Sequence, residues 1–107
     1  MSLALEKSPL FEADLTAQFV WYAERGGTDL AWRFFAAVES TVTQLAGQPE
    51  LGRLRSFPNP NLQGLRSFRV EPPFDQWVVF YRATPVTVQI WRLMHGARDL
   101  PRRLRGG

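Results

Sequence analysis

The chain has a single histidine, His95, at the point where an apolar run ends in a glycine turn followed by Arg98 and Asp99. An imidazole can accept or donate a proton near neutral pH, and guanidinium groups can stabilise a phosphorane or a leaving oxygen. His95, Arg69 and Arg98 are therefore the candidate catalytic residues, and the chemistry they fit is RNA cleavage. The alternative is structural, because a histidine at a strand end often hydrogen-bonds the turn that follows it, and Arg98 with Asp99 can fix that turn.

Several other chemistries are excluded by composition. The sequence has no cysteine, only one histidine and no carboxylates at metal-ligand spacing, so we expect no metal. None of the serines lies in a nucleophile-elbow pattern, and there is no glycine-rich phosphate loop or dinucleotide fingerprint. We therefore expect no cofactor.

Charge is distributed unevenly along the chain. Residues 1–50 hold three basic and seven acidic side chains, a net of −4, whereas residues 51–107 hold ten arginines against three acidic residues, a net of +7. Arginine pairs well with carboxylates and phosphates, so the second half favours an acidic protein or a nucleic acid as partner. A solvated arginine-rich surface is the alternative interpretation. The charged residues expected to contact a partner are Arg66, Arg82, Arg92, Asp99, Arg102 and Arg103.

Hydrophobic periodicity predicts the elements that position these residues. Ser8 followed by Pro9 is a helix start, and Gly26-Gly27 ends that helix. Thr28 can cap a second helix, which Gly47 ends. The stretch 48–63, rich in proline and asparagine, is predicted to be a long loop. The predicted strands are 3–8, 65–71, 77–82 and 86–94.

This order predicts an α+β fold, β-α-α-β-β-β, in which a helical hairpin packs on one face of a small antiparallel sheet. Residues 1–107 are expected to form one domain. The predicted core residues are Phe19, Tyr22, Phe34, Val38, Leu45, Phe68, Val70, Val79, Val88 and Ile90.

The other sheet face has no helix to cover it. Strict alternation places Val78, Phe80, Trp91 and Leu93 there, beside arginines, which predicts a protein-binding groove with Trp91 and Leu93 as anchors. The alternative is that the N-terminal segment, the long loop and the tail cover this face. No apolar run reaches membrane-spanning length and no signal peptide is recognisable, so we expect a cytoplasmic protein that does not bind membranes.

Several segments, in this order, resemble the RelE/ParE toxin superfamily of bacterial toxin–antitoxin modules, whose members are often called plasmid stabilisation proteins. The most specific is the His-Gly-Ala-Arg-Asp run that follows an apolar strand. The segments are Tyr22, Ala31-x-Arg33-Phe34, Pro49-Glu-Leu-Gly-Arg53, Gly64-Leu-Arg-Ser-Phe68, Val79-Phe-Tyr-Arg82 and Ile90-Trp-Arg-Leu-Met-His-Gly-Ala-Arg-Asp99. The resemblance implies the same fold, a toxic action on the host, and neutralisation by a cognate antitoxin.

The superfamily divides by target. RelE-like members cleave mRNA in the ribosomal A site without a metal, and ParE-like members inhibit DNA gyrase. Arg66 and Arg69 match the basic positions on the second strand, and Arg98 matches the arginine after the last strand. Val78 stands where a ribonuclease is expected to have arginine, and no C-terminal tyrosine is present, although His95 can substitute in principle. The pattern therefore favours a gyrase inhibitor.

The alternatives are a ribosome-dependent mRNA endoribonuclease, with ribosome and mRNA as partners, and a non-toxic member that only binds its antitoxin. The net charge of +7 in residues 51–107 suits an acidic, amphipathic antitoxin segment that folds on binding. A homodimer and a toxin–antitoxin hetero-oligomer are both compatible with the sequence.

Overall fold

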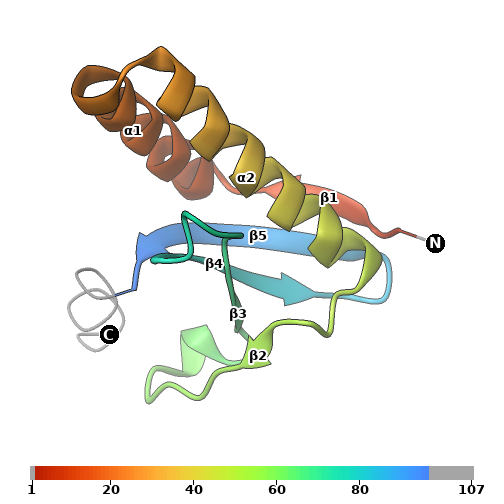
Figure 1. The fold of residues 1–107 in the computed structure, drawn as a ribbon. Helices are drawn as coiled ribbons and strands as arrows, with labels where there is room; N and C mark the ends of the chain where they lie inside the picture. Colours follow the sequence, from red (N-terminus) through yellow and green to blue (C-terminus); the bar gives the residue numbers. More distant parts are fainter. Residues whose placement is uncertain (1, 97–107) are drawn as a thin grey trace.

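In a computed structural model that describes residues 2–96, two helices pack on one face of a five-stranded sheet (Figure 1). The predicted α+β class and the order of its elements are confirmed. Within these residues the elements are β1 (Ala4–Lys7), α1 (Pro9–Gly26), α2 (Thr28–Gly47), β2 (Arg53–Leu54), the 3₁₀ turn η1 (Pro60–Leu62), β3 (Arg66–Arg69), β4 (Trp77–Ala83) and β5 (Thr87–His95). Neither helix combines the length and hydrophobicity that crossing a membrane requires, among the residues described.

The sheet has the strand order β1-β5-β4-β3-β2. It is mixed and not wholly antiparallel, because β1 runs parallel to β5 while the other neighbours are antiparallel. Apolar alternation indicates a strand but not its direction, so the sequence could not reveal this. β2 is a further short strand inside the stretch predicted to be a loop.

Local signals in the sequence explain the helix ends. The Ser8 hydroxyl accepts the N–H of Phe11 at 3.0 Å and donates to the carbonyl of Trp91, so the start of α1 is tied to β5. Gly27 has φ +92°, a left-handed conformation that favours glycine. Gly27 also occupies the N-cap position of α2, so the prediction that Thr28 caps this helix is wrong.

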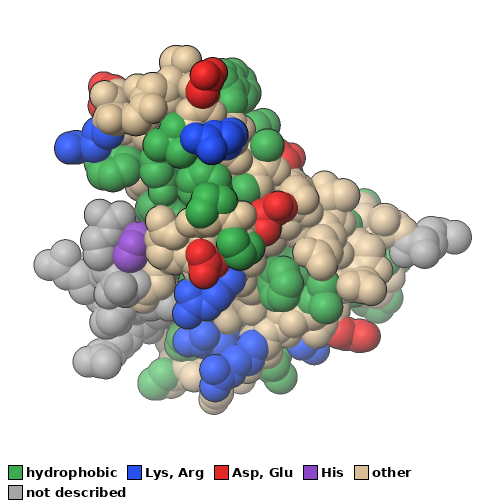
Figure 2. Space-filling view, viewed as in Figure 1, with side chains coloured by type: hydrophobic (Ala, Val, Ile, Leu, Met, Phe, Trp, Pro, Cys, Tyr) green, Lys and Arg blue, Asp and Glu red, His purple; other side chains and the backbone are tan. Residues whose placement is uncertain are grey.

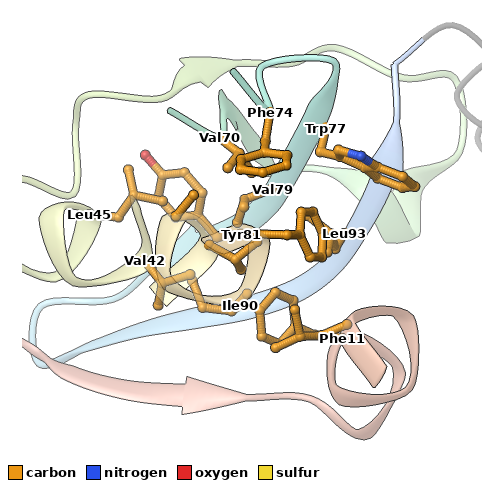
Figure 3. Packing of buried hydrophobic residues seen from close by; sticks show 14 of the residues in the cluster. Phe11, Val42, Leu45, Val70, Phe74, Trp77, Val79, Tyr81, Ile90 and Leu93 are labelled. Atoms are coloured by element: carbon orange, nitrogen blue, oxygen red, sulfur yellow. The ribbon is translucent and has the colours of Figure 1, made fainter. Parts of the chain in front are cut away.

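The main core lies between the helical hairpin and the sheet (Figure 3). Its aromatic members include Phe11, Phe34, Phe74 and Tyr81, which pack among aliphatic side chains from both helices and from β4 and β5. Phe19 and Phe68 are half-buried at its margin, and the other predicted core residues are buried. The core prediction is therefore confirmed except at these two positions.

The opposite face of the sheet is covered by the chain itself. Figure 1 shows the segment that contains η1 lying on the side of the sheet away from the helices. Leu62 and Leu65 from this segment form a second cluster with Val78, Phe80 and Met94, and Phe57 and Trp91 pack against it. The prediction of a bare apolar face is wrong. Of the three segments in the alternative interpretation, the long loop covers part of the face, and the tail lies outside the described residues.

A β-bulge explains why Leu93 was assigned to the wrong face. The pairing of β4 with β5 shifts between Phe80 and Tyr81, so Tyr81 pairs with Ile90 and Phe80 with Arg92. Trp91 is the extra residue, so Ile90 and Leu93 both face the helices. Leu93 is only 3% exposed in the main core and cannot anchor a partner there.

Arg92, the residue after the bulge, forms an ion pair with α1. Its guanidinium donates to both carboxylate oxygens of Asp14, at 2.7 and 2.9 Å, and the N–H of Leu93 donates to the same carboxylate at 3.0 Å. Arg92, predicted to need a partner, has one within the chain. The two side chains are 13% and 16% exposed, so this ion pair is largely removed from water. It joins α1 to β5 beyond the end of β1.

We expect Asp14→Ala to lower the free energy of unfolding by about 2–4 kcal/mol, because it removes the largely buried carboxylate that accepts from the Arg92 guanidinium and from the N–H of Leu93. Glu39→Ala is the matched control. It breaks the more exposed ion pair between Lys7 and Glu39 and should cost less than about 1 kcal/mol. Urea unfolding of the three proteins measures the difference. Equal losses for the two variants would contradict this ranking.

Candidate functional site

A groove of about 740 Å³ lies where β2, the end of β3, the start of β4 and the end of β5 meet. Three arginines and the histidine are among the residues that line it, and none of the lining residues described in the structure is acidic. Figure 2 shows basic side chains gathered over the β2 and β3 region. The lining residues are Leu51, Arg53, Arg55, Ser67, Phe68, Arg69, Gln76, Val78, His95 and Gly96. We call this feature the arginine groove.

Neutral groups hold the arginines of the groove in place. Arg53 pairs with Ser67 across β2 and β3. Arg55 donates from Nη1 to the Ser67 hydroxyl at 3.2 Å, and its guanidinium lies 5.8 Å from the Phe57 ring. Arg69 donates from Nη1 to the carbonyl of Asp75 at 2.7 Å. The contacts of Arg55 and Arg69 orient these two cations without neutralising them, whereas the strand pairing fixes the backbone of Arg53.

His95 is positioned through the main core. It pairs with Trp77 across β4 and β5, and the two rings meet edge to face with centroids 5.3 Å apart. The Trp77 indole N–H donates to the Tyr22 hydroxyl on α1 at 3.0 Å. The N–H of Gly96 donates to the carbonyl of Gln76 at 2.8 Å and so starts the turn after β5. The imidazole is thus held at the rim of the groove by side chains that belong to the core.

The turn before β2 is fixed by a buried hydroxyl. Tyr81 donates from its hydroxyl to the carbonyl of Pro49 at 2.7 Å and accepts the N–H of Gly52 at 2.8 Å. Arg66 donates to the carbonyl of Gly52 at 2.8 Å. A Cβ on Gly52 would lie 2.4 Å from the Tyr81 hydroxyl oxygen, so only glycine fits. We call this set of contacts the Tyr81 latch; it determines where Arg53 enters the groove.

Burial raises the pKa of Tyr81 above its ordinary value, and the Gly52 N–H and the Arg66 charge oppose that rise in part. The hydroxyl therefore keeps its proton through the neutral range and serves as both donor and acceptor in the latch.

Arg69, Val78 and His95 all line the arginine groove; Arg69 pairs with Val78, and His95 pairs with Trp77 one residue earlier on β4. Arg98 lies outside the described residues 2–96, as do Asp99, Arg102 and Arg103. Of the predicted partner contacts, Arg66 belongs to the Tyr81 latch and Arg92 is paired with Asp14.

Arg82 and Trp91 lie together in a second, smaller depression of about 280 Å³, on the β1 and β5 side of the sheet. Arg82 donates to the carbonyls of Gln63 and Asn61, which helps to hold the long loop against the sheet. The other residues that line this depression are Glu6, Lys7, Ser8, Gln89 and Ile90.

Sequence reasoning did not identify Arg53 and Arg55. Both fall in a stretch whose prolines and asparagines predicted irregular structure. The usable signal was the alternation Arg53-Leu54-Arg55 directly after Gly52, which is typical of a short strand with one charged face.

Two helices packed on one face of a mixed five-stranded sheet is the architecture of known ParE- and RelE-like toxins. Residues 5–100 match the family model described as the ParE toxin of the type II toxin–antitoxin system parDE. The chain therefore belongs to the ParE toxin family of type II toxin–antitoxin systems.

Solved structures support the same fold. The chain is similar to a structure titled as the chromosomal ParDE system from P. aeruginosa, with a TM-score of 0.71, 21% identity, and 88% of this chain and 96% of that chain covered. It is also similar to the RelBE2 toxin–antitoxin complex from Mycobacterium tuberculosis, with a TM-score of 0.58, 21% identity, and 89% and 99% covered. YafQ from E. coli follows, with a TM-score of 0.56, 19% identity, and 89% and 94% covered. No curated protein sequence matches the chain.

We expect Tyr81→Phe to lower the free energy of unfolding by about 1–3 kcal/mol at neutral pH, because two buried backbone groups lose their partner. The folded-state pKa of Tyr81 is raised above its ordinary value of 10.0, so this residue's contribution to stability is fully present below pH 10 and falls as the pH rises through the folded-state pKa. Urea unfolding between pH 7 and pH 11 should show a smaller alkaline loss in Tyr81→Phe than in the unmodified chain. Identical pH profiles would refute this assignment.

Proposed function

We propose that this member of the ParE toxin family inhibits DNA gyrase and that a cognate antitoxin holds it inactive. The observation that carries the proposal is the content of the arginine groove, which offers three cations but a single proton-transfer group, His95, among the lining residues described. Such a groove is suited to holding an anionic or protein partner more than to breaking a phosphodiester bond.

Metal-independent RNA cleavage requires two proton transfers. A base removes the proton of the attacking 2′-hydroxyl, and an acid protonates the leaving oxygen, and each group must lie within hydrogen-bond reach of its proton. His95 can fill one of these roles. Val78, 5% exposed, occupies the third-strand position where the family resemblance leads us to expect arginine in a ribonuclease.

An acidic antitoxin suits the charge of this chain. Residues 51–107 carry a net charge of +7, and solved relatives with the same fold include toxin–antitoxin complexes. The depression that contains Arg82 and Trp91 offers a half-buried indole next to a cation, which suits an amphipathic acidic segment. With Leu93 buried in the core, Trp91 is the remaining aromatic anchor of the two proposed from the sequence.

The second candidate function is mRNA cleavage at the ribosome. It is favoured by the placement of Arg69 and His95 in one groove, where a guanidinium can stabilise charge next to a proton-transfer group. In that case His95→Ala would lower the rate of mRNA cleavage about 10²–10⁴-fold and would relieve growth arrest.

Controlled expression of the chain in a bacterium should separate the candidates. We expect DNA breaks and induction of the SOS response while mRNA stays intact, and the purified chain should inhibit supercoiling by gyrase in vitro. Rapid translation arrest with cleaved mRNA would instead support the ribonuclease. Normal growth combined with antitoxin binding would identify a non-toxic member of the family.

We also expect Trp91→Ala to weaken antitoxin binding about 30-fold or more, as loss of an interface tryptophan commonly does. Trp32→Ala is the matched control. Trp32 is an exposed tryptophan on α2 that lines neither the arginine groove nor the depression around Arg82 and Trp91. Calorimetric titration with the antitoxin measures both affinities, and thermal unfolding verifies that each variant is folded. Equal affinities for the two variants would remove Trp91 from the interface.

A further inference from the structure

We propose that the arginine groove binds the phosphodiester backbone of DNA, so that the toxin engages gyrase while the enzyme holds its DNA. The biological setting rests on the proposed function, but the binding itself can be measured without gyrase. The residues that carry it are Arg53, Arg55 and Arg69.

The first step is that these cations lack carboxylate partners within the described part of the chain. The ion pairs among residues 2–96 are Lys7 with Glu39 and Arg92 with Asp14, and neither involves a groove arginine. The hydrogen bonds of Arg55 and Arg69 go to a hydroxyl and a carbonyl. A guanidinium has five N–H donors, so most of each group's donors are left to bind an anion.

The second step is that the cations form a row. Arg53 and Arg55 stand two residues apart on one extended segment, which places their side chains on the same face about 6.6–6.8 Å apart along the strand. On the neighbouring strand, Arg69 lies two residues beyond Ser67, the partner of Arg53. This repeat is close to the separation of successive phosphates along one nucleic-acid strand, so a polyanion can contact several arginines at once.

The third step is the chemistry of the remaining lining. The Ser67 hydroxyl, the Gln76 amide and the His95 imidazole can all donate hydrogen bonds, and no lining carboxylate opposes an anion. Hydroxyl, amide and guanidinium groups are the usual contacts to DNA phosphates, which fix position without reading sequence. Leu51, which is 40% exposed, and the half-buried Phe68 add some apolar surface to the groove. The row of arginines, with the hydroxyl and amide donors beside it, favours a phosphate backbone over an acidic peptide.

The experiment measures binding of the full chain to a fluorescent 20-base-pair DNA duplex by anisotropy, without gyrase, across a salt titration. Arg53→Gln and Arg69→Gln replace exposed arginines, and each should reduce the slope of log K against log salt by about 0.9 and weaken binding severalfold. Arg53→Lys should keep the slope. Arg33→Gln, an exposed arginine on α2, is the matched control and should bind like the unmodified chain.

An unchanged salt slope in both Arg→Gln variants would overturn the proposal. Tighter binding of a poly-glutamate peptide than of DNA, lost in the same variants, would overturn it in favour of an acidic protein. Tighter binding of a 20-nucleotide RNA, with cleavage that requires His95, would overturn it in favour of the ribonuclease.

A parallel supercoiling assay separates this inference from the proposed function. If the chain binds DNA through the groove but leaves gyrase unaffected, the inference stands and gyrase inhibition fails. If the chain inhibits gyrase, and Arg53→Gln and Arg69→Gln inhibit it and bind DNA equally well, the inference fails and gyrase inhibition stands.

Discussion

The groove of this toxin depends on one buried hydroxyl, that of Tyr81. It donates to Pro49 and accepts from Gly52, so a turn far away in sequence is fixed to the centre of the sheet. That turn leads directly into β2, and β2 places Arg53 across from Ser67. A backbone N–H or carbonyl buried without a partner is costly, so the three groups hold one another in a single arrangement. The position of Arg53 in the groove follows from this arrangement.

Burial by distant parts of the chain also explains how the far face of the sheet is covered. A bare apolar face beside arginines would be a binding surface for a partner. Leu62 and Leu65 instead pack against this face and bury Phe80 and Met94. The long loop therefore has a structural role, since it covers one part of the face and leaves an open, cationic groove beside it. Arg82 helps to hold the loop against this face through hydrogen bonds to loop carbonyls. Two depressions remain open beside the covered part, and these are the surfaces to which we assign partner binding.

These two depressions differ in chemistry, and we therefore assign a different partner to each. The arginine groove presents unneutralised cations and a histidine, which suits a repeating anion. The depression around Trp91 and Arg82 presents an indole beside a cation, which suits an amphipathic acidic segment. A toxin that acts through one surface and is recognised at another can be neutralised by a segment that spans both.

Helix ends, the α+β class and most of the core could be predicted from the sequence, because they depend on local patterns: Ser8-Pro9, Gly26-Gly27, and apolar residues at regular spacing. The placement of Arg69 and His95 at the same end of the sheet also follows from strand order. Only the tertiary structure decided the face of Leu93, the partner of Arg92 and the presence of Arg53 and Arg55 in the groove. The reason is physical: a bulge shifts alternation by one residue, and a loop rich in proline is positioned by contacts such as those of Tyr81, which are distant in sequence and leave no periodic signal.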